Sequence, residues 1–94
     1  MSAAETLRLR ITGQVQGVGY RLWATRTAAS LGLRGWVRNR RDCSVEALVI
    51  GRPEDVAAMV EAAHKGPPGA RVAELTATPD DDDCSVGFTA LPTE

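Results

Sequence analysis

The residues of this chain that could do chemistry lie in two short segments. The first, residues 13–21, reads Gly-Gln-Val-Gln-Gly-Val-Gly-Tyr-Arg and ends on Arg21. Glycines allow backbone N–H groups to turn toward an anion, and an arginine adds a charged, forked donor. The second segment ends on Asn39, whose carboxamide can either hold a water molecule or form a turn at the end of a strand. The first segment therefore predicts a site for an anion such as phosphate.

The charges around Arg21 favour a bound anion. Arg21 lies where a helix is expected to begin, and a cation is unfavourable beside the partial positive charge of a helix N-terminus. Residues 6–41 hold eight arginines and no acid, whereas eleven acids and only three basic residues follow from Asp42 onward. A dianion would be attracted by the helix start, the loop amides and the guanidinium together. The alternative is an exposed arginine whose stem packs on a sheet.

The hydrophobic pattern predicts five strands and two helices. Leu7, Leu9 and Ile11 alternate with polar residues, as in a half-buried strand, while a stripe through Val56 and Met59 has helical spacing. The expected strands are Thr6–Gly13, Leu33–Asn39, Ser44–Ile50, Val72–Thr78 and Ser85–Leu91; the expected helices are Tyr20–Leu31 and one that opens at 51–55.

This element order predicts an α+β, ferredoxin-like sandwich. The order βαββαβ plus a C-terminal edge strand places two helices on one face of a mixed, mainly antiparallel sheet with strand order 4-1-3-2-5. In that topology residues 14–20 and 39–43 leave the same edge of the sheet. We therefore expect Arg21 and Asn39 to lie close together.

Bulk properties bound the class of protein. The 94 residues suit a single domain spanning 1–94, with a hydrophobic fraction of 44%. No apolar run approaches the roughly 18 residues of a membrane span, and the N-terminal segment lacks a signal-peptide pattern. Cys43 and Cys84 are too few for a disulfide scaffold and lack metal-ligand spacing, so free thiols, no disulfide between them and a cytoplasmic location are expected.

Two motifs resemble the acylphosphatase family over nearly the whole chain. They are Gly13-x-Val15-Gln16-Gly17-Val18-x-Tyr20-Arg21 and Gly32-Leu33-x-Gly35-Trp36-Val37-x-Asn39, followed by Asp42-x-Ser44-Val45-Glu46. The resemblance implies hydrolysis of small acyl phosphates to a carboxylate and inorganic phosphate, without metal or cofactor. It also implies that Arg21 binds phosphate and Asn39 orients the attacking water. The backbone of the loop would hold the phosphate, through Gln16, Gly17, Val18, Gly19 and Tyr20.

The chain departs from the family pattern at two positions. Tyr20 replaces the usual Phe before the arginine, and Cys43 replaces a usual turn glycine. If the turn needs a positive φ, Cys43 costs about 1 kcal/mol. The single histidine, His64, is expected on the surface, far from the loop.

Other functions remain to be separated from the enzyme. One is a non-catalytic, anion-binding or regulatory module on the same scaffold. Another is an RNA-binding ferredoxin-like domain, but such domains stack bases on aromatic residues of the central strands, and only Trp36 stands there. We therefore expect a small-molecule partner, no nucleic acid or membrane partner, and a monomer. The sequence does not choose among acyl phosphates.

Overall fold

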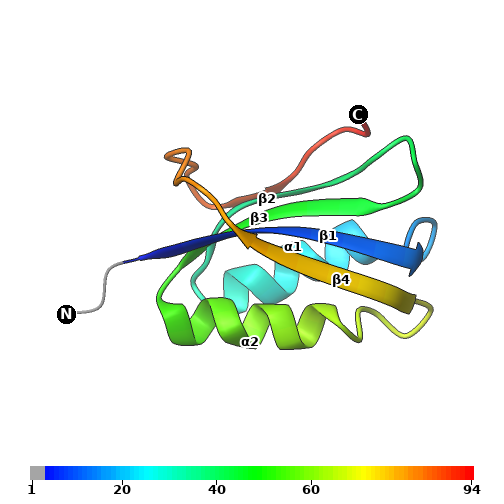
Figure 1. The fold of residues 1–94 in the computed structure, drawn as a ribbon, viewed down its shortest axis with the longest axis horizontal. Coiled ribbons are helices and arrows are strands. Elements are labelled where there is room, and N and C mark those ends of the chain that lie inside the picture. The colour runs from blue at the N-terminus through cyan, green and yellow to red at the C-terminus, as the bar shows by residue number, and fades with distance from the viewer. Residues whose placement is uncertain (1–3) are drawn as a thin grey trace.

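The computed structural model describes residues 4–94, which form two helices and five strands (Figure 1). Residues 1–3 of the N-terminal segment, considered above for a signal peptide, lie outside the described residues. The elements in chain order are β1 (Glu5–Gln14), α1 (Tyr20–Ser30), β2 (Arg34–Asn39), β3 (Val45–Gly51), α2 (Pro53–Ala63), β4 (Arg71–Pro79) and β5 (Phe88–Ala90).

The strands form one mixed sheet in the order β4-β1-β3-β2-β5. β3 lies between β1 and β2 and is antiparallel to both, so β1 and β2 run parallel to each other. β4 is antiparallel to β1, while β5 is parallel to β2. Because β1 and β2 run parallel, the segments that follow them emerge at the same end of the sheet. The predicted α+β, ferredoxin-like sandwich and its strand order are confirmed.

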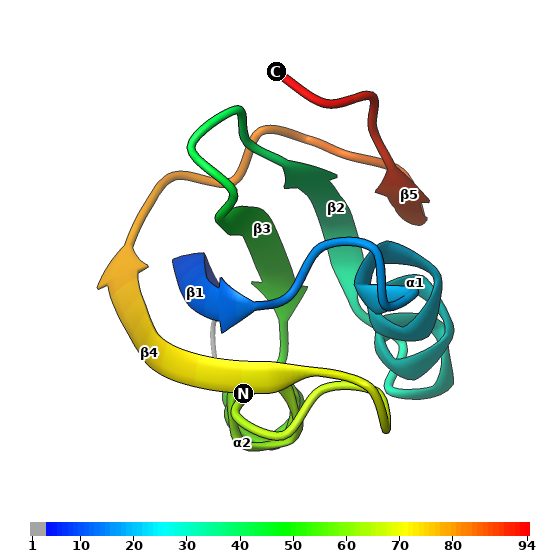
Figure 2. The same cartoon turned by 90° about the vertical axis from the view of Figure 1, so that its right-hand side faces the viewer.

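Both helices cover the same face of the sheet (Figure 2) and bury the main core against it. Leu9 and Ile11 of β1 point into this core, as the alternating pattern predicted. In α1 the buried positions are Tyr20, Ala24 and Ala28, each one turn after the last, and the two small alanine side chains let this helix approach the sheet closely. The other residues of this main core that are at most 2% exposed are Val15, Val37, Val45, Ala47, Val49, Val56, Met59 and Ala63.

The opposite face of the sheet carries charged residues around one tryptophan. Trp36 is only 8% exposed and packs with Leu48 and Ile50. The Arg38 guanidinium carbon lies 4.4 Å from the Trp36 ring centroid, within the range of a cation–π contact. The indole nitrogen donates a 3.0 Å hydrogen bond to Asp83. The ring is therefore covered rather than presented for stacking.

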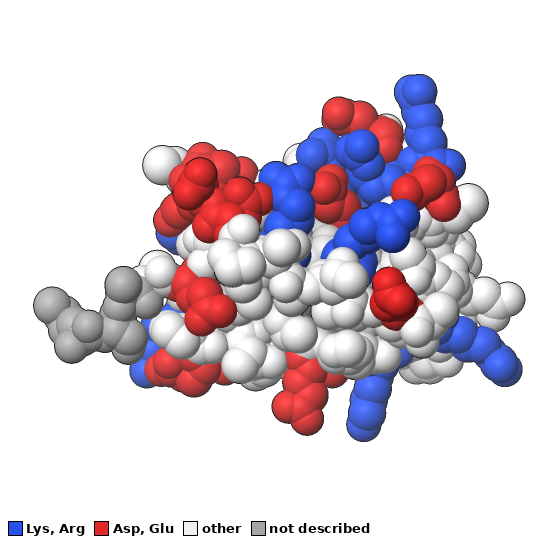
Figure 3. Space-filling model, viewed as in Figure 1, with Lys and Arg blue, Asp and Glu red and all other residues white. Residues whose placement is uncertain are grey.

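Most of the arginines that precede Asp42 are neutralised within the fold. Five of the eight form ion pairs with carboxylates from Asp42 onward: Arg8, Arg10, Arg34, Arg38 and Arg40. Figure 3 shows this interleaving of acidic and basic side chains, with acidic residues gathered at the end of the molecule where the loop before β5 lies. The charge asymmetry along the sequence therefore mostly reflects a network of ion pairs within the fold. Only the arginines outside this network remain as evidence for an anionic partner.

The fifth strand is shorter than predicted, Phe88–Ala90 in place of Ser85–Leu91. Before this strand, both the backbone N–H and the hydroxyl of Ser85 donate hydrogen bonds to Asp83. The Arg34 guanidinium donates a hydrogen bond to the Ser85 carbonyl oxygen. Gly87 has φ 69°, which breaks the extended backbone. After the strand the chain continues along β2, because Leu91 N–H donates to Val37 O at 2.8 Å and Glu94 N–H to Asn39 O at 3.0 Å.

The two cysteines lie at opposite ends of β2, so they are not placed to form a disulfide. Cys43 follows the end of β2, whereas Cys84 precedes β5, whose first residue pairs with Gly35 near the start of β2. Both thiols are free and exposed.

Candidate active site

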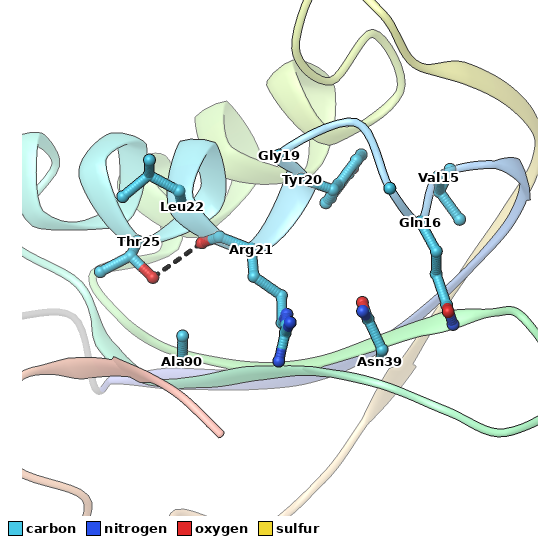
Figure 4. Close-up of a pocket in the computed structure, with 10 residues that line it drawn as sticks. Val15, Gln16, Gly19, Tyr20, Arg21, Leu22, Thr25, Asn39 and Ala90 are labelled. Carbon is cyan, nitrogen blue, oxygen red and sulfur yellow. Dashed lines mark hydrogen bonds between the residues drawn. The ribbon is translucent and has the colours of Figure 1, made fainter. Parts of the chain in front are cut away.

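A pocket of about 520 Å³ opens at the end of the sheet where β1 and β2 terminate. It is lined by the loop after β1, the first turns of α1, the last residue of β2 and the last residue of β5. Figure 4 shows the Arg21 side chain reaching from α1 toward the end of β2, where Asn39 points into the same space. Arg21 and Asn39 therefore line the same pocket, as expected from the topology. The lining residues are Val15, Gln16, Gly17, Gly19, Tyr20, Arg21, Leu22, Thr25, Asn39 and Ala90.

The loop presents backbone groups because its glycines adopt left-handed conformations. Gly17 has φ 74° and Gly19 has φ 79°, values that other residues adopt only at a cost. Gly19 is the N-cap of α1 and provides no side-chain cap, and the first turn of the helix contains no acid. The first N–H groups of α1 thus lack a side-chain partner, which is the arrangement that favours an anion.

Arg21 is the cation of the pocket and has no carboxylate partner among the described residues. It is partly buried, and Nη1 donates a 3.0 Å hydrogen bond to the carbonyl oxygen of Leu91. This bond fixes the direction of the guanidinium while using one of its five donors. The backbone carbonyl of Arg21 accepts a 2.8 Å hydrogen bond from Thr25 Oγ1 (Figure 4). The remaining guanidinium donors are available to a ligand.

Asn39 is the last residue of β2 and its backbone is fixed on both sides. It pairs in register with Val45 of β3, and its carbonyl accepts a hydrogen bond from the Glu94 N–H at 3.0 Å. Its side-chain amide forms no hydrogen bond within residues 4–94 and faces the pocket (Figure 4). A carboxamide in this position can accept one hydrogen bond and donate two.

Gln16 connects the loop to the hairpin that carries Asn39. Its Nε2 donates 2.8 Å hydrogen bonds to the carbonyl oxygens of Arg40 and Ser44. These two residues also close the turn, because the Arg40 N–H donates to Ser44 O at 2.8 Å. The sequence motif includes Gln16, but the resemblance alone assigned it only a backbone role.

The turn after Asn39 is held by Asp42. Its Oδ1 accepts hydrogen bonds from the Ser44 N–H and hydroxyl, and Arg10 pairs with Oδ2 at 2.8 Å. The Ser44 hydrogen bonds and the Arg10 charge hold the pKa of Asp42 well below its usual range. Cys43 has φ 75°, so this turn does require the left-handed conformation that a glycine would adopt freely.

Tyr20 joins the start of α1 to the end of α2. Its hydroxyl donates a buried 2.6 Å hydrogen bond to the carbonyl oxygen of Ala63, and burial raises the pKa of the phenol. The ring packs edge-to-face with Trp23 at 5.2 Å between centroids. The hydroxyl that distinguishes this residue from the usual Phe is thus satisfied within the fold.

Val18 lines a second hollow together with Cys43 and does not line the pocket of Arg21. The role expected of Val18 is that of a backbone donor, and this role stays a prediction. His64 is exposed, as predicted, and does not line the pocket. The carbonyl of its neighbour Ala63 accepts the hydrogen bond from Tyr20, so the end of α2 contacts the start of α1.

The sequence reasoning missed three contributions to the site. These are the Leu91 carbonyl on Arg21, the Gln16 side chain, and the pocket walls Leu22, Thr25 and Ala90. The predicted strand order could have indicated the contact between the Leu91 carbonyl and Arg21. It placed the fifth strand beside the second, so the end of the chain had to pass near Asn39.

The chain matches a family model and several known proteins. The family model "Acylphosphatase" matches residues 7–90. The chain belongs to the acylphosphatase family. A curated protein of Rhodospirillum rubrum named acylphosphatase is 51% identical over 88 residues, covering 94% of this chain and 97% of its own.

Solved structures of acylphosphatases share the fold closely. One from Coxiella burnetii aligns with TM-score 0.90 and 26% identity, covering 94% of this chain and 93% of its own. One from Bacillus subtilis gives TM-score 0.88 and 32% identity, covering 92% and 97%. The family resemblance drawn from the two motifs is confirmed, and with it the assignment to a family of hydrolases.

Neither a metal centre nor a membrane-spanning helix is found among the described residues. Within 4–94 no group of three or more His, Cys, Asp or Glu side chains is arranged to hold a metal ion. Neither helix in this range has the length and apolar character needed to cross a bilayer.

Proposed function

We propose that the chain hydrolyses the carboxyl–phosphate bond of small acyl phosphates, giving a carboxylate and inorganic phosphate. One observation carries the proposal. A guanidinium without a carboxylate partner, a helix start without a side-chain cap and an unbonded carboxamide line one pocket. Membership of the acylphosphatase family supports the same reaction.

The phosphate group would bind between Arg21 and the loop. The proposed donors are the backbone N–H groups of residues 16–20 together with the free donors of Arg21. The left-handed conformations of Gly17 and Gly19 support this role for the loop, because they turn successive N–H groups in a common direction. The hydrogen bond to Leu91 O supports it for Arg21, since a held guanidinium loses little freedom on binding.

Asn39 would hold the attacking water in line with the bond to be broken. The water oxygen forms a bond to phosphorus, the bond from phosphorus to the acyl oxygen breaks, and its electron pair leaves on the carboxylate. The proton of the water passes to a phosphate oxygen of the substrate. The protein supplies positioning and charge stabilisation, which are the main requirements of phosphoryl transfer.

The composition of the pocket matches an acyl phosphate better than a phosphate monoester. A carboxylic acid has a pKa of about 4–5, so the leaving group departs without being protonated. Among residues 4–94, Tyr20 and Arg21 are the only ionisable side chains that line the pocket. The Tyr20 hydroxyl is buried against Ala63 O, and the pKa of the phenol is raised, so it is not a proton donor at this place.

The test is hydrolysis of benzoyl phosphate in the presence of a metal chelator. Arg21→Ala should weaken inhibition by inorganic phosphate and lower kcat/KM about a hundredfold or more. Arg26→Ala is the matched control, because Arg26 lies on the same helix, is exposed and does not line the pocket. Equal losses in the two variants would count against the site.

The non-catalytic alternative gives a different result in the same assay. An anion-binding module would bind phosphate and lose that binding in Arg21→Ala, yet leave benzoyl phosphate intact. An RNA-binding role finds little support, because the Trp36 ring is covered by Arg38 and engaged with Asp83. The single-domain organisation, the monomeric state and the cytoplasmic location stay predictions.

A further inference from the structure

The pocket is larger than a phosphate group requires. Its volume of about 520 Å³ falls in the range of sites that enclose a whole small molecule. Gln16, Gly17, Gly19, Arg21 and Asn39 surround the part proposed to hold phosphate. The remaining space extends along α1 toward β5 and is available to another part of the substrate.

The walls of this extension carry no charge. They are formed by Leu22 and Thr25 of α1 and by Ala90 of β5. In Figure 4 Thr25 and Ala90 lie on the side of α1 toward which Arg21 reaches, whereas the Leu22 side chain lies at the opposite, outer side of the helix. The Thr25 hydroxyl donates to the Arg21 carbonyl, so its hydrogen is used within the helix. Ala90 presents only a methyl group. A ligand group in this space meets mostly hydrocarbon.

Leu22 is an unusual residue on the surface of this protein. Its side chain is 57% exposed, and among the described residues Val86 is the only other large hydrophobic residue that is exposed. Val86 lies in the loop before β5 and lines neither pocket. Leu22 directly follows Arg21 on an ordered helix, and an apolar ligand resting on it would remove exposed hydrocarbon from water.

We infer that Leu22, Thr25 and Ala90 form the binding site for the acyl group, and that this site selects apolar, uncharged acyl groups. The inference rests on the proposed function, because the anion site fixes which end of the substrate lies at Arg21. Aliphatic or aromatic acyl phosphates fit these walls. An acyl group with a second negative charge would leave that charge without a partner among the lining residues, which is costly when water is displaced.

The experiment compares acetyl, butyryl, benzoyl and 4-carboxybenzoyl phosphate as substrates. In the unmodified protein kcat/KM should rise from acetyl to butyryl to benzoyl phosphate and fall again for 4-carboxybenzoyl phosphate. Leu22→Ser should lower the ratio of kcat/KM for benzoyl over acetyl phosphate about tenfold, the typical effect of lost hydrocarbon contact in a specificity pocket. Inhibition by inorganic phosphate should stay unchanged, since phosphate does not reach the extension.

Two further variants sharpen the comparison. Ala90→Phe fills the extension and should lower kcat/KM for benzoyl phosphate while sparing acetyl phosphate. Val86→Ser removes the other exposed hydrophobic side chain and should alter neither substrate ratio nor phosphate inhibition.

The outcomes separate this inference from the proposed function. If no acyl phosphate is hydrolysed, the proposed function fails, and the acyl site fails with it. If all four are hydrolysed at similar kcat/KM, or the carboxylated substrate is preferred, the proposed function stands and the apolar acyl site is rejected. An unchanged ratio in both Leu22→Ser and Ala90→Phe would reject it as well.

Discussion

The side-chain nitrogen of Gln16 donates a 2.8 Å hydrogen bond to the carbonyl oxygen of Ser44, and so joins the glycine loop to the turn between β2 and β3. A second bond of the same length reaches Arg40 O at the other side of that turn. The loop carries the backbone donors proposed for phosphate, while the turn begins next to Asn39. One side chain therefore sets the spacing between the two halves of the candidate site.

Removing this link should damage catalysis more than phosphate binding. Gln16→Ala leaves two carbonyl oxygens without their side-chain donor and frees the turn to shift relative to the loop. We expect kcat for benzoyl phosphate to fall about tenfold to a hundredfold, since small displacements of positioned groups have effects of this size. The inhibition constant for phosphate should change much less. Both quantities come from steady-state kinetics.

Gln14→Ala serves as the control for Gln16. Gln14 is exposed at the end of β1, and its side chain forms no hydrogen bond within residues 4–94. It should retain the kcat of the unmodified protein. A Gln16→Ala protein with unchanged kcat would show that the turn keeps its place without the link.

Cys43 should limit stability because of its backbone conformation. A non-glycine residue at φ 75° costs about 1–2 kcal/mol, whereas a glycine costs about 0.4–1 kcal/mol through the greater freedom of the unfolded chain. The difference predicts that Cys43→Gly raises the free energy of unfolding by about 0.5–1 kcal/mol. Urea denaturation measures this change.

Cys43→Ala separates backbone strain from the loss of the thiol. Alanine keeps the Cβ atom, so this variant should not show the gain expected for glycine. If both variants are stabilised equally, the thiol rather than the φ angle is responsible.

Glu46 should make the stability conferred by this network of ion pairs sensitive to acid. Its side chain is 15% exposed and accepts from Arg8 at 2.8 Å and Arg38 at 3.0 Å. Burial alone would raise the pKa of Glu46, but the bonds from the two arginines hold it below the usual 4.5. A lowered pKa in the folded state stabilises the fold above the unfolded pKa, and this contribution is lost as the pH falls below about 4.5.

Glu46→Gln should remove this contribution and lower the free energy of unfolding at pH 7 by about 1–3 kcal/mol, as expected for lost hydrogen bonds to charged groups. The difference between variant and unmodified protein should shrink as the pH is lowered through 4.5 and below. Glu74→Gln is the control, since Glu74 is exposed on β4 and its carboxylate forms no ion pair within residues 4–94. A difference that stays constant from pH 7 to pH 3 would contradict the role of the ionised carboxylate.

The sequence predicted those parts of the structure that depend on local pattern. Alternation at Leu7, Leu9 and Ile11 indicated β1, and the element order then fixed the topology, because few arrangements of βαββαβ bury both helices on one face. That topology was sufficient to bring Arg21 and Asn39 to one end. The two motifs were sufficient to identify the family.

The remaining features depend on side-chain contacts between distant segments, which no local pattern encodes. The shortening of β5 results from bonds that Asp83 and Arg34 make to Ser85, 2 and 51 positions away along the chain. The hydrogen bond from Arg21 to Leu91 O spans 70 positions. The part of the pocket that we assign to the acyl group is lined by residues of α1 and β5, which are far apart in the sequence.

The central claim is that Arg21 and the loop bind phosphate while Asn39 positions water, and Asn39→Ala tests it most directly. Phosphate affinity, measured by calorimetry, and kcat for benzoyl phosphate should be determined on the same preparation. We predict that phosphate affinity stays within about twofold, while kcat falls about a hundredfold to a thousandfold, the cost of one positioned donor. Full activity in Asn39→Ala, or a loss of phosphate binding that accounts for the whole loss of activity, would contradict this division of roles.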